Sequence, residues 1–133
     1  MTPCFADTFF FLALLNAQDQ GYHLKARAAN AVARPIVTSA WVLIELADHL
    51  CDERNRHLYS KVLQAFQSDP RFEIVPALQS TLDAATDLYQ QRPDKAWSLT
   101  DCTSFVLMQQ RLLTEALTAD HHFEQAGFQA LLK

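Results

Sequence analysis

Four carboxylates stand where apolar runs of the chain end or where a helix begins, namely Asp7, Glu45, Asp101 and Asp120. In an open α/β sheet the carboxyl ends of the strands gather at one edge, and ligands bind there. If the strands before these acids are parallel neighbours, the four acids meet in one pocket. Such a cluster repels itself unless a divalent cation holds it, and hard oxygen ligands suit Mg²⁺ or Mn²⁺. The sequence therefore predicts a metal site.

Three of these acids also have a purely structural interpretation. Asp7 and Asp120 directly precede expected helices, where an aspartate satisfies free backbone amides as an N-cap. Ser98 to Asp101 matches the capping box, in which the fourth residue reaches back to the first. Taken singly, each of the three fits a cap better than a metal ligand. The joint pattern of three acids at sheet-edge positions and a fourth in an apolar helix favours the metal site.

Glu45 is the fourth acid, and it lies within a helix expected over residues 40–52. It shares a helical stripe with His49 and Asp52, so it could belong to a solvated polar face. The residues on either side of it are apolar, however, which predicts a mostly buried helix. A carboxylate in such a helix needs a partner, and no Lys or Arg lies between Pro35 and Asp52.

Other groups give weaker indications of chemistry. His121 and His122 beside Asp120 could suggest zinc, but no HxxxH or Cys/His spacing supports it, and we expect one of the pair to be exposed. Cys102 has no local base, which favours a buried thiol over a nucleophile. The densest basic cluster is either a solvated helix face or a phosphate-binding rim, and it comprises Arg54, Arg56, His57 and Lys61.

The elements that must position the acids alternate between strand and helix patterns. Apolar runs predict strands over 3–6, 36–38, 72–75 and 116–118, with an edge strand over 128–132. Helices are expected over 8–17, 22–33, 40–52, 55–68, 81–91, 100–113 and 121–126, with Gly21 separating the first two. This alternation predicts a single domain over residues 1–133, a three-layer α/β/α sandwich with a mainly parallel central sheet.

Composition agrees with a globular domain, because 50% of the 133 residues are hydrophobic and 20% are charged. A net charge of −4 argues against a protein coated with positive charge for non-specific nucleic-acid binding, although it does not exclude a nucleic-acid substrate. The three cysteines show no CxxC spacing, which is typical of reduced thiols. The apolar stretch 9–15 is too short to span a bilayer, so we expect a cytoplasmic protein without membrane association.

Blocks of sequence around the acids resemble the PIN domain family, and in particular the VapC-type toxin ribonucleases. The blocks are Ala6-Asp7-Thr8-Phe9-Phe10, Val42-Leu43-Ile44-Glu45-Leu46, Leu99-Thr100-Asp101-Cys102-Thr103-Ser104-Phe105, and Leu117-Thr118-Ala119-Asp120-His121-His122-Phe123 followed by Gln125-Ala126-Gly127-Phe128. They span nearly the whole chain in the order of the family. The stretch 52–97 carries no family motif.

This resemblance implies that the four acids hold Mg²⁺ or Mn²⁺ and that Thr8 and Thr100 support them. It implies an endoribonuclease that leaves a 5′-phosphate and a 3′-hydroxyl, with a free carboxylate such as Asp101 or Asp120 positioning the attacking water. It also implies a homodimer and the toxin role in a type II toxin–antitoxin pair. The cognate antitoxin would block the site, often with a basic side chain.

Two alternatives keep the fold and change the function: a PIN-like domain in RNA processing, and a non-catalytic module that accepts a basic peptide in its acidic pocket. A receiver-type phosphoacceptor also gathers acids at strand ends. That architecture needs a lysine near the last strand, and none lies between Lys95 and Lys133. A metal-dependent ribonuclease remains the first hypothesis.

Overall fold

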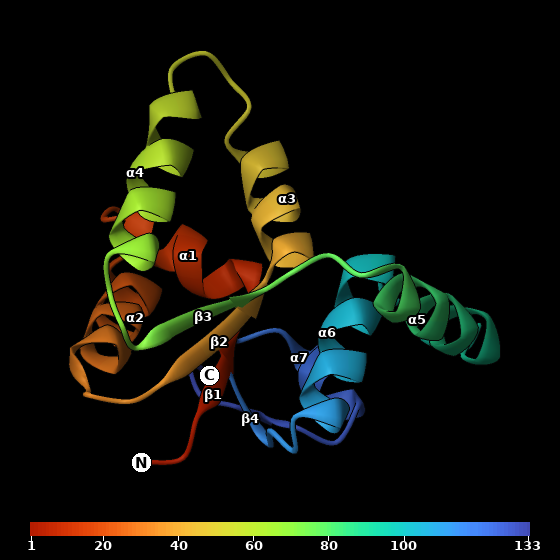
Figure 1. Ribbon diagram of the computed structural model, residues 1–133. Coiled ribbons are helices and arrows are strands. Elements are labelled where there is room, and N and C mark those ends of the chain that lie inside the picture. Colours follow the sequence, from red (N-terminus) through yellow and green to blue (C-terminus); the bar gives the residue numbers. More distant parts are fainter.

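Five short parallel strands form the centre of the protein, and helices cover both of their faces (Figure 1). The computed structural model describes residues 1–133. The strands are β1 (Cys4–Ala6), β2 (Ile36–Ser39), β3 (Phe72–Val75), β4 (Glu115–Leu117) and β5 (Gln129–Ala130). The helices are α1 (Thr8–Leu15), α2 (Gln20–Ala31), α3 (Ala40–His49), α4 (Arg56–Gln67), α5 (Gln79–Gln91), α6 (Leu99–Gln110) and α7 (His121–Gln125).

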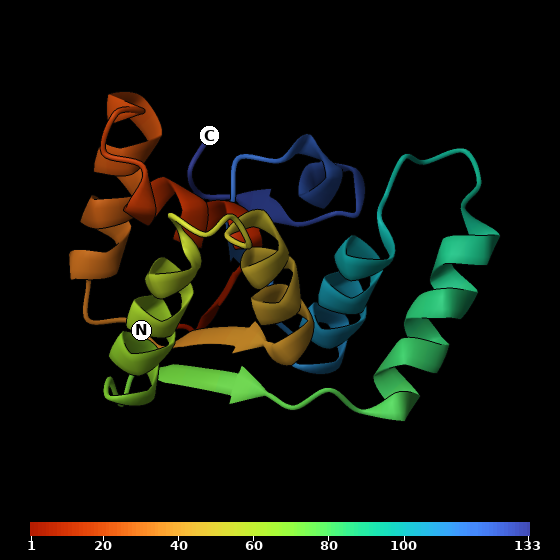
Figure 2. The same cartoon turned by 90° about the horizontal axis from the view of Figure 1, so that it is seen from above.

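The layers follow from the order of the strands. Neighbours in the sheet run β3-β2-β1-β4-β5, and every neighbouring pair is parallel. Helices α1 to α4 lie toward one face of the sheet, and α5 to α7 lie toward the other (Figure 1). Seen from above, α2 and α5 stand at opposite ends of the molecule (Figure 2). The predicted three-layer sandwich with a parallel sheet is confirmed.

Strand β1 is the central strand of the sheet. Strands β2 and β3 are added on one side of it and β4 and β5 on the other, so the direction in which successive strands are added reverses at β1. Phe5 pairs with Val37 of β2 on one side and with Ala116 of β4 on the other. All three residues of β1 are buried, which suits a strand covered on both faces. The carboxyl ends of β1 and β4 therefore lie together at the switch point of the sheet, the place where open α/β sheets bind ligands.

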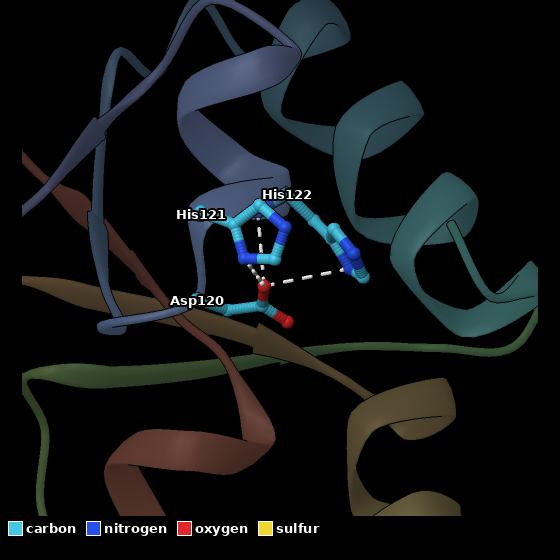
Figure 3. Close-up of side chains that lie close together, drawn as sticks. All are labelled: Asp120, His121 and His122. Atoms are coloured by element: carbon cyan, nitrogen blue, oxygen red, sulfur yellow. Dashed lines mark hydrogen bonds and ion pairs between the residues drawn. The ribbon is translucent and has the colours of Figure 1, made fainter. Parts of the chain in front are cut away.

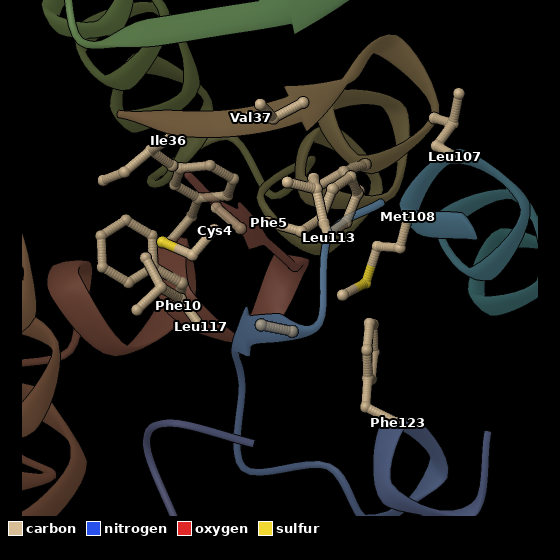
Figure 4. Packing of buried hydrophobic residues seen from close by; sticks show 14 of the residues in the cluster. Cys4, Phe5, Phe10, Ile36, Val37, Leu107, Met108, Leu113, Leu117 and Phe123 are labelled. Atoms are coloured by element: carbon tan, nitrogen blue, oxygen red, sulfur yellow. The ribbon is translucent and has the colours of Figure 1, made fainter. Parts of the chain in front are cut away.

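The core on both sides of the sheet is rich in aromatic rings. Apolar side chains of β1, β2 and β4 pack against those of the flanking helices (Figure 4). On the α6 side, Phe105 contacts the rings of Trp97, Phe123 and Phe128 at centroid distances of 5.0, 5.0 and 5.8 Å. This cluster joins α6 to α7, so the acids at the starts of these helices are held in a fixed relation.

Several helix boundaries differ from the sequence prediction by two or three residues, most clearly around the break between α1 and α2 and at the end of α3. Gly21 does not separate the first two helices, because it lies in the first turn of α2 and the break occurs earlier, over 16–19. Helix α3 ends at His49 instead of residue 52. Asn16 accepts a bond from the Gln18 amide, a local alternative to helical bonding that a count of apolar spacing misses. None of the helices combines the length and the apolar character needed to cross a bilayer.

Helix α6 ends in a Schellman motif that places a leucine in an unfavourable conformation. The Leu113 amide donates to the Met108 carbonyl, and the Leu112 amide donates to the Gln109 carbonyl. Leu112, at the left-handed position of the motif, has a φ of 56° and is 85% exposed. A side chain there meets steric cost that glycine avoids, and this leucine buries almost nothing in return.

We therefore predict that Leu112→Gly raises the free energy of unfolding by up to about 1 kcal/mol. The measurement is urea denaturation followed by circular dichroism. Ala65→Gly is the control, because Ala65 is exposed inside α4, and there glycine should destabilise by roughly 1 kcal/mol. Equal destabilisation by both substitutions would contradict the prediction.

Candidate metal centre

All four predicted acids line one hollow at the carboxyl edge of the sheet, with a volume of about 310 Å³. Asp7 connects β1 to α1, Glu45 lies in α3, Asp101 is in the first turn of α6, and Asp120 directly precedes α7. Other polar residues of the wall are Thr8, His49, Ser98 and His122. The strand order and the contact of α3 with α6 thus bring together residues that are widely spaced in the sequence.

Asp7 is the deepest of the four acids and is only 5% exposed. It occupies the N-cap position of α1, but its side chain makes no capping bond, so the structural interpretation does not hold for this residue. Instead, its Oδ2 accepts a hydrogen bond of 3.1 Å from the Thr118 hydroxyl. The Thr118 oxygen in turn accepts the Asp120 amide at 3.1 Å. Thr118 therefore links the acids that follow β1 and β4.

Asp101 and Asp120 do cap helices, and each uses one carboxylate oxygen for it. Oδ2 of Asp101 accepts the Ser98 amide at 3.1 Å, while the Ser98 hydroxyl accepts the Asp101 amide, which completes the capping box. Oδ1 of Asp120 accepts the His122 amide at 2.9 Å. Both acids nevertheless line the hollow, so capping and metal binding are compatible here. The caps fix the orientation of the carboxylates and leave the other oxygen of each without a hydrogen bond.

Glu45 reaches the hollow from a helix that is less buried than predicted. Its neighbour Ile44 is 53% exposed, so the expectation of a mostly buried helix is wrong for this face of α3. The Glu45 carboxylate makes no hydrogen bond and no ion pair. Asp52, on the same stripe, lies beyond the end of α3 and pairs with Arg54 at 3.1 Å, away from the hollow. The two acids of the stripe therefore have different surroundings.

The charge of the hollow is not balanced by any lysine or arginine. Acids elsewhere on the surface pair with these cations, as Glu115 does with Arg34 at 2.6 Å, whereas none of the four acids of the hollow does. Burial, followed by the negative charge of Asp101 and of Glu45, raises the pKa of Asp7 to about 7. Burial and the nearby charge of Asp120 also raise the pKa of Asp101, against the lowering effect of its hydrogen bonds. The hollow therefore contains no lysine or arginine to offset its negative charge.

Two histidines gather around Asp120 (Figure 3). Their Nδ1 atoms lie 3.6 Å (His121) and 3.4 Å (His122) from Oδ1 of Asp120, and the three side chains form a group whose possible ligand atoms lie within 4.8 Å of one another. His122 Nδ1 also lies 3.1 Å from Oδ2 of Asp101. The prediction that one of the pair is exposed is confirmed, because the His121 side chain is 67% exposed. The entry of His122 into the acid site was not predicted.

The residues of the hollow fit a divalent cation. The donors are mainly carboxylate oxygens, which suit Mg²⁺ and Mn²⁺, and an imidazole at the margin is acceptable to Mn²⁺. The Thr8 hydroxyl also lines the hollow, is buried, and has no hydrogen-bond partner. A buried hydroxyl without a partner is costly unless a ligand or water satisfies it. Asp7, Glu45, Asp101 and Asp120 are the residues that could hold the ion.

Other residues singled out in the sequence lie elsewhere. Thr100 does not line the hollow, and Thr118 supplies the supporting hydroxyl instead. Cys102 is buried, and burial together with the charge of Asp101 raises the pKa of its thiol to about 11, so it is not a nucleophile at neutral pH. None of the four residues of the basic cluster lines the acid hollow. Two of them, Arg56 and His57, line a separate hollow between α3 and α4.

The raised pKa of Asp7 predicts how stability depends on pH without metal. Between about pH 4 and pH 7 the folded chain keeps a proton on Asp7 that the unfolded chain has released, so the free energy of unfolding falls as the pH rises. The fall is at most about 1.4 kcal/mol for each pH unit and ends above the folded pKa. The measurement is urea denaturation in EDTA at several pH values.

Asp7→Asn should remove this contribution, so its free energy of unfolding should exceed that of the parent above pH 7. Asp52→Asn is the control and should keep the fall, because the pKa of Asp52 is lowered by its bonds to Arg54 and not raised. Parallel curves for the parent and Asp7→Asn would contradict the assignment.

Comparison with known proteins agrees with this fold. The structure of VapC20 from Mycobacterium tuberculosis, a sarcin–ricin loop cleaving toxin, matches with a TM-score of 0.82 at 25% sequence identity, over 94% of this chain and 95% of that one. VapBC2 from Rickettsia felis, solved bound to a DNA fragment from their promoter, matches in fold with a TM-score of 0.68 at 15% identity, over 98% of this chain and 96% of that one.

The sequence comparisons give the family directly. No curated protein matches the chain. The model of the family described as the PIN domain matches residues 4–129, which is nearly the whole chain. The resemblance seen in the sequence is therefore confirmed: the chain belongs to the PIN domain family, and VapC toxins are its structural neighbours.

Proposed function

We propose that this protein is a metal-dependent endoribonuclease that hydrolyses RNA phosphodiester bonds with Mg²⁺ or Mn²⁺ as its cofactor. One observation carries the proposal: four carboxylates line a single hollow at the switch point of the sheet, and no lysine or arginine neutralises them. Membership of the PIN family and the likeness to VapC20, a toxin that cleaves RNA, support it. The proposed site residues are Asp7, Glu45, Asp101 and Asp120.

The residues of the hollow would share the work of hydrolysis. A bound divalent cation would supply positive charge for the scissile phosphate and acidify a water molecule. Asp7 is rigid because it is buried and bonded to Thr118, and this rigidity fixes the place of the cation. The caps hold Asp101 and Asp120 by one oxygen each and leave the other oxygen free to bind the cation or the water. Such preorganisation lowers the barrier because the groups need not rearrange during the reaction.

We assign the positioning of the attacking water to Asp120. Its side chain is 31% exposed, against 10% for Asp101, so it lies on the solvent side of the hollow, from which water arrives. The water oxygen would form the new bond to phosphorus, the bond to the 3′ oxygen would break, and the proton would pass to that leaving oxygen. The products are a 5′-phosphate and a 3′-hydroxyl, as the resemblance to the family implies.

The toxin role in a toxin–antitoxin pair is part of this proposal. An acidic hollow without a cation of its own is a suitable receptor for a basic side chain of an antitoxin, which would displace the metal and block the site. A small open reading frame for a DNA-binding protein overlapping this gene upstream would support the role. Its absence would favour RNA processing as the function of the same nuclease.

The proposal predicts how the chain responds to exchanging acids for amides. Asparagine caps helices about as well as aspartate, so Asp7→Asn, Asp101→Asn and Asp120→Asn should leave the metal-free protein as stable as the parent or more stable. Cleavage of RNA in Mg²⁺ or Mn²⁺ should fall by at least about a hundredfold. The rise in melting temperature on adding metal should shrink, because it follows metal affinity. Glu45→Gln should behave in the same way.

Asp52→Asn is the matched control, since Asp52 lies on the stripe of Glu45 but pairs with Arg54 outside the hollow. It should keep both cleavage and the metal-induced rise in melting temperature. RNA cleavage assays and thermal melts with metal or EDTA test these variants. Retained cleavage in both Asp101→Asn and Glu45→Gln, or full activity of the parent in EDTA, would overturn the proposal. Metal binding by a parent that cleaves no RNA would favour the non-catalytic module.

A symmetric homodimer completes the proposal. Exposed apolar side chains occur in α2 (Tyr22 and Leu24), directly after α2 (Val32) and in α3 (Ile44). Two-fold homodimers are the commonest assemblies of soluble proteins, and exposed apolar groups are suited to such an interface. Light scattering at micromolar concentration should give a dimer mass. Leu24→Glu should shift it toward the monomer, whereas Leu78→Glu, an exposed leucine outside these elements, should not. A monomeric parent would rule the interface out.

A further inference from the structure

A second hollow adjoins the acid-lined one. It has a volume of about 510 Å³ and lies where the end of α5 passes into the connection to α6. Tyr89, Arg92, Lys95 and Trp97 contribute to its wall. Ala96 lines both hollows, so they share one boundary. A molecule bound over the acids can therefore continue into this second hollow, which we call the Tyr89 hollow.

The Tyr89 hollow contains a lysine and an arginine, whereas the acid hollow contains neither. Of the 11 lysines and arginines in the chain, six are engaged in ion pairs with acids, and Lys95 is not one of them. The Lys95 side chain makes no hydrogen bond either. Asp94 lies nearby, but Arg92 already pairs with it at 2.9 Å. Arg92 and Lys95 thus share a single acid, Asp94. The Lys95 ammonium therefore remains available to bind an anion at the edge of the acid hollow.

The Tyr89 hollow contains two aromatic side chains, and only one of them is free to contact a ligand. The Arg92 guanidinium lies over the Trp97 ring at 5.3 Å, and the Trp97 Nε1 donates to Gln125 at 3.0 Å. Trp97 is therefore already engaged and is only 6% exposed. Tyr89 has no ring partner and is 51% exposed. It is the ring on which a flat ligand can stack.

We propose that the Tyr89 hollow is a nucleotide subsite of the RNA substrate. In it, Tyr89 stacks on a base and the Lys95 ammonium binds an adjacent phosphate, while the scissile phosphodiester lies over the acids. The inference rests on the ribonuclease function proposed above and adds a specificity element to it. A volume of about 510 Å³ is within the range of pockets that hold small ligands, roughly 300–1,000 Å³, so one nucleotide fits.

The subsite defines the class of RNA that the protein accepts. A base can stack on Tyr89 only if it leaves the stack of its own strand, and in RNA such bases occur in loops, bulges and single strands. Stacking on an aromatic ring tolerates every base, because each has a flat face. The substrate is therefore an RNA with an unpaired nucleotide beside the cleaved bond, and fully paired RNA is excluded from the subsite.

Binding is tested apart from cleavage in an Asp101→Asn background, which the proposed mechanism renders inactive. A fluorescently labelled single-stranded RNA of about ten nucleotides is the probe, and anisotropy in Mg²⁺ is the readout. Adding Tyr89→Ala should weaken binding by about 5- to 150-fold, the equivalent of one lost stacking contact. Tyr89→Phe should restore most of it. Lys95→Gln should weaken binding and reduce the slope of log K against log salt by about 0.7.

Lys61→Gln is the control for lost charge, since Lys61 is exposed on α4 and lies outside both hollows. It should bind RNA as the Asp101→Asn background does, and a paired RNA of the same length should bind more weakly than the single strand. Unchanged binding in both Tyr89→Ala and Lys95→Gln would overturn the subsite. Cleavage that depends on the four acids would survive that result, so the failure of the subsite and the failure of the nuclease proposal are distinguishable.

Discussion

Uncompensated negative charge at the edge of the sheet is the constraint around which this molecule is arranged. Asp7 and Asp101 are almost fully buried, yet neither pairs with a lysine or an arginine, and burial raises the pKa of both carboxyls. Burying like charges together costs free energy, which a fold tolerates where a cation or a ligand offsets it. The rest of the structure holds these acids close together. Strand β1 holds Asp7, the helix caps hold Asp101 and Asp120, and an aromatic cluster joins α6 to α7.

The same constraint explains the distribution of the cations. A lysine or an arginine inside the acid hollow would neutralise the carboxylates and compete with a metal ion, so these cations must lie beside the hollow. Arg92 and Lys95 meet this condition, because they line the neighbouring hollow that shares Ala96. A net charge of −4 is therefore compatible with an RNA substrate, since the local order of acids and cations matters more than their sum.

Much of this could be predicted from the sequence, because it depends on local patterns. Apolar runs followed by acids predicted the strands, their parallel direction and the four carboxylates that line one hollow. What could not be predicted depends on contacts between distant elements. His122 reaches Asp101 only because α7 packs beside α6, and Thr118 reaches Asp7 only because β4 pairs with β1. Ile44 is apolar and yet exposed, which no periodicity could show. The stretch 52–97 has no motif, and the place of Lys95 beside the acids follows from the packing of α5 on α6.

The central position of β1 has a consequence for the newborn chain. The contact between Thr118 and Asp7 spans 111 residues, and Asp120 is the last of the four acids in the sequence. A ribosome that has already released the first acid must still deliver the chain as far as residues 115–117 before β4 can pair with β1. Unfinished chains therefore hold the early carboxylates without the late ones. If the folded protein cleaves RNA, the ribosome that makes it meets only chains with an incomplete set of the four acids until Asp120 has been synthesised.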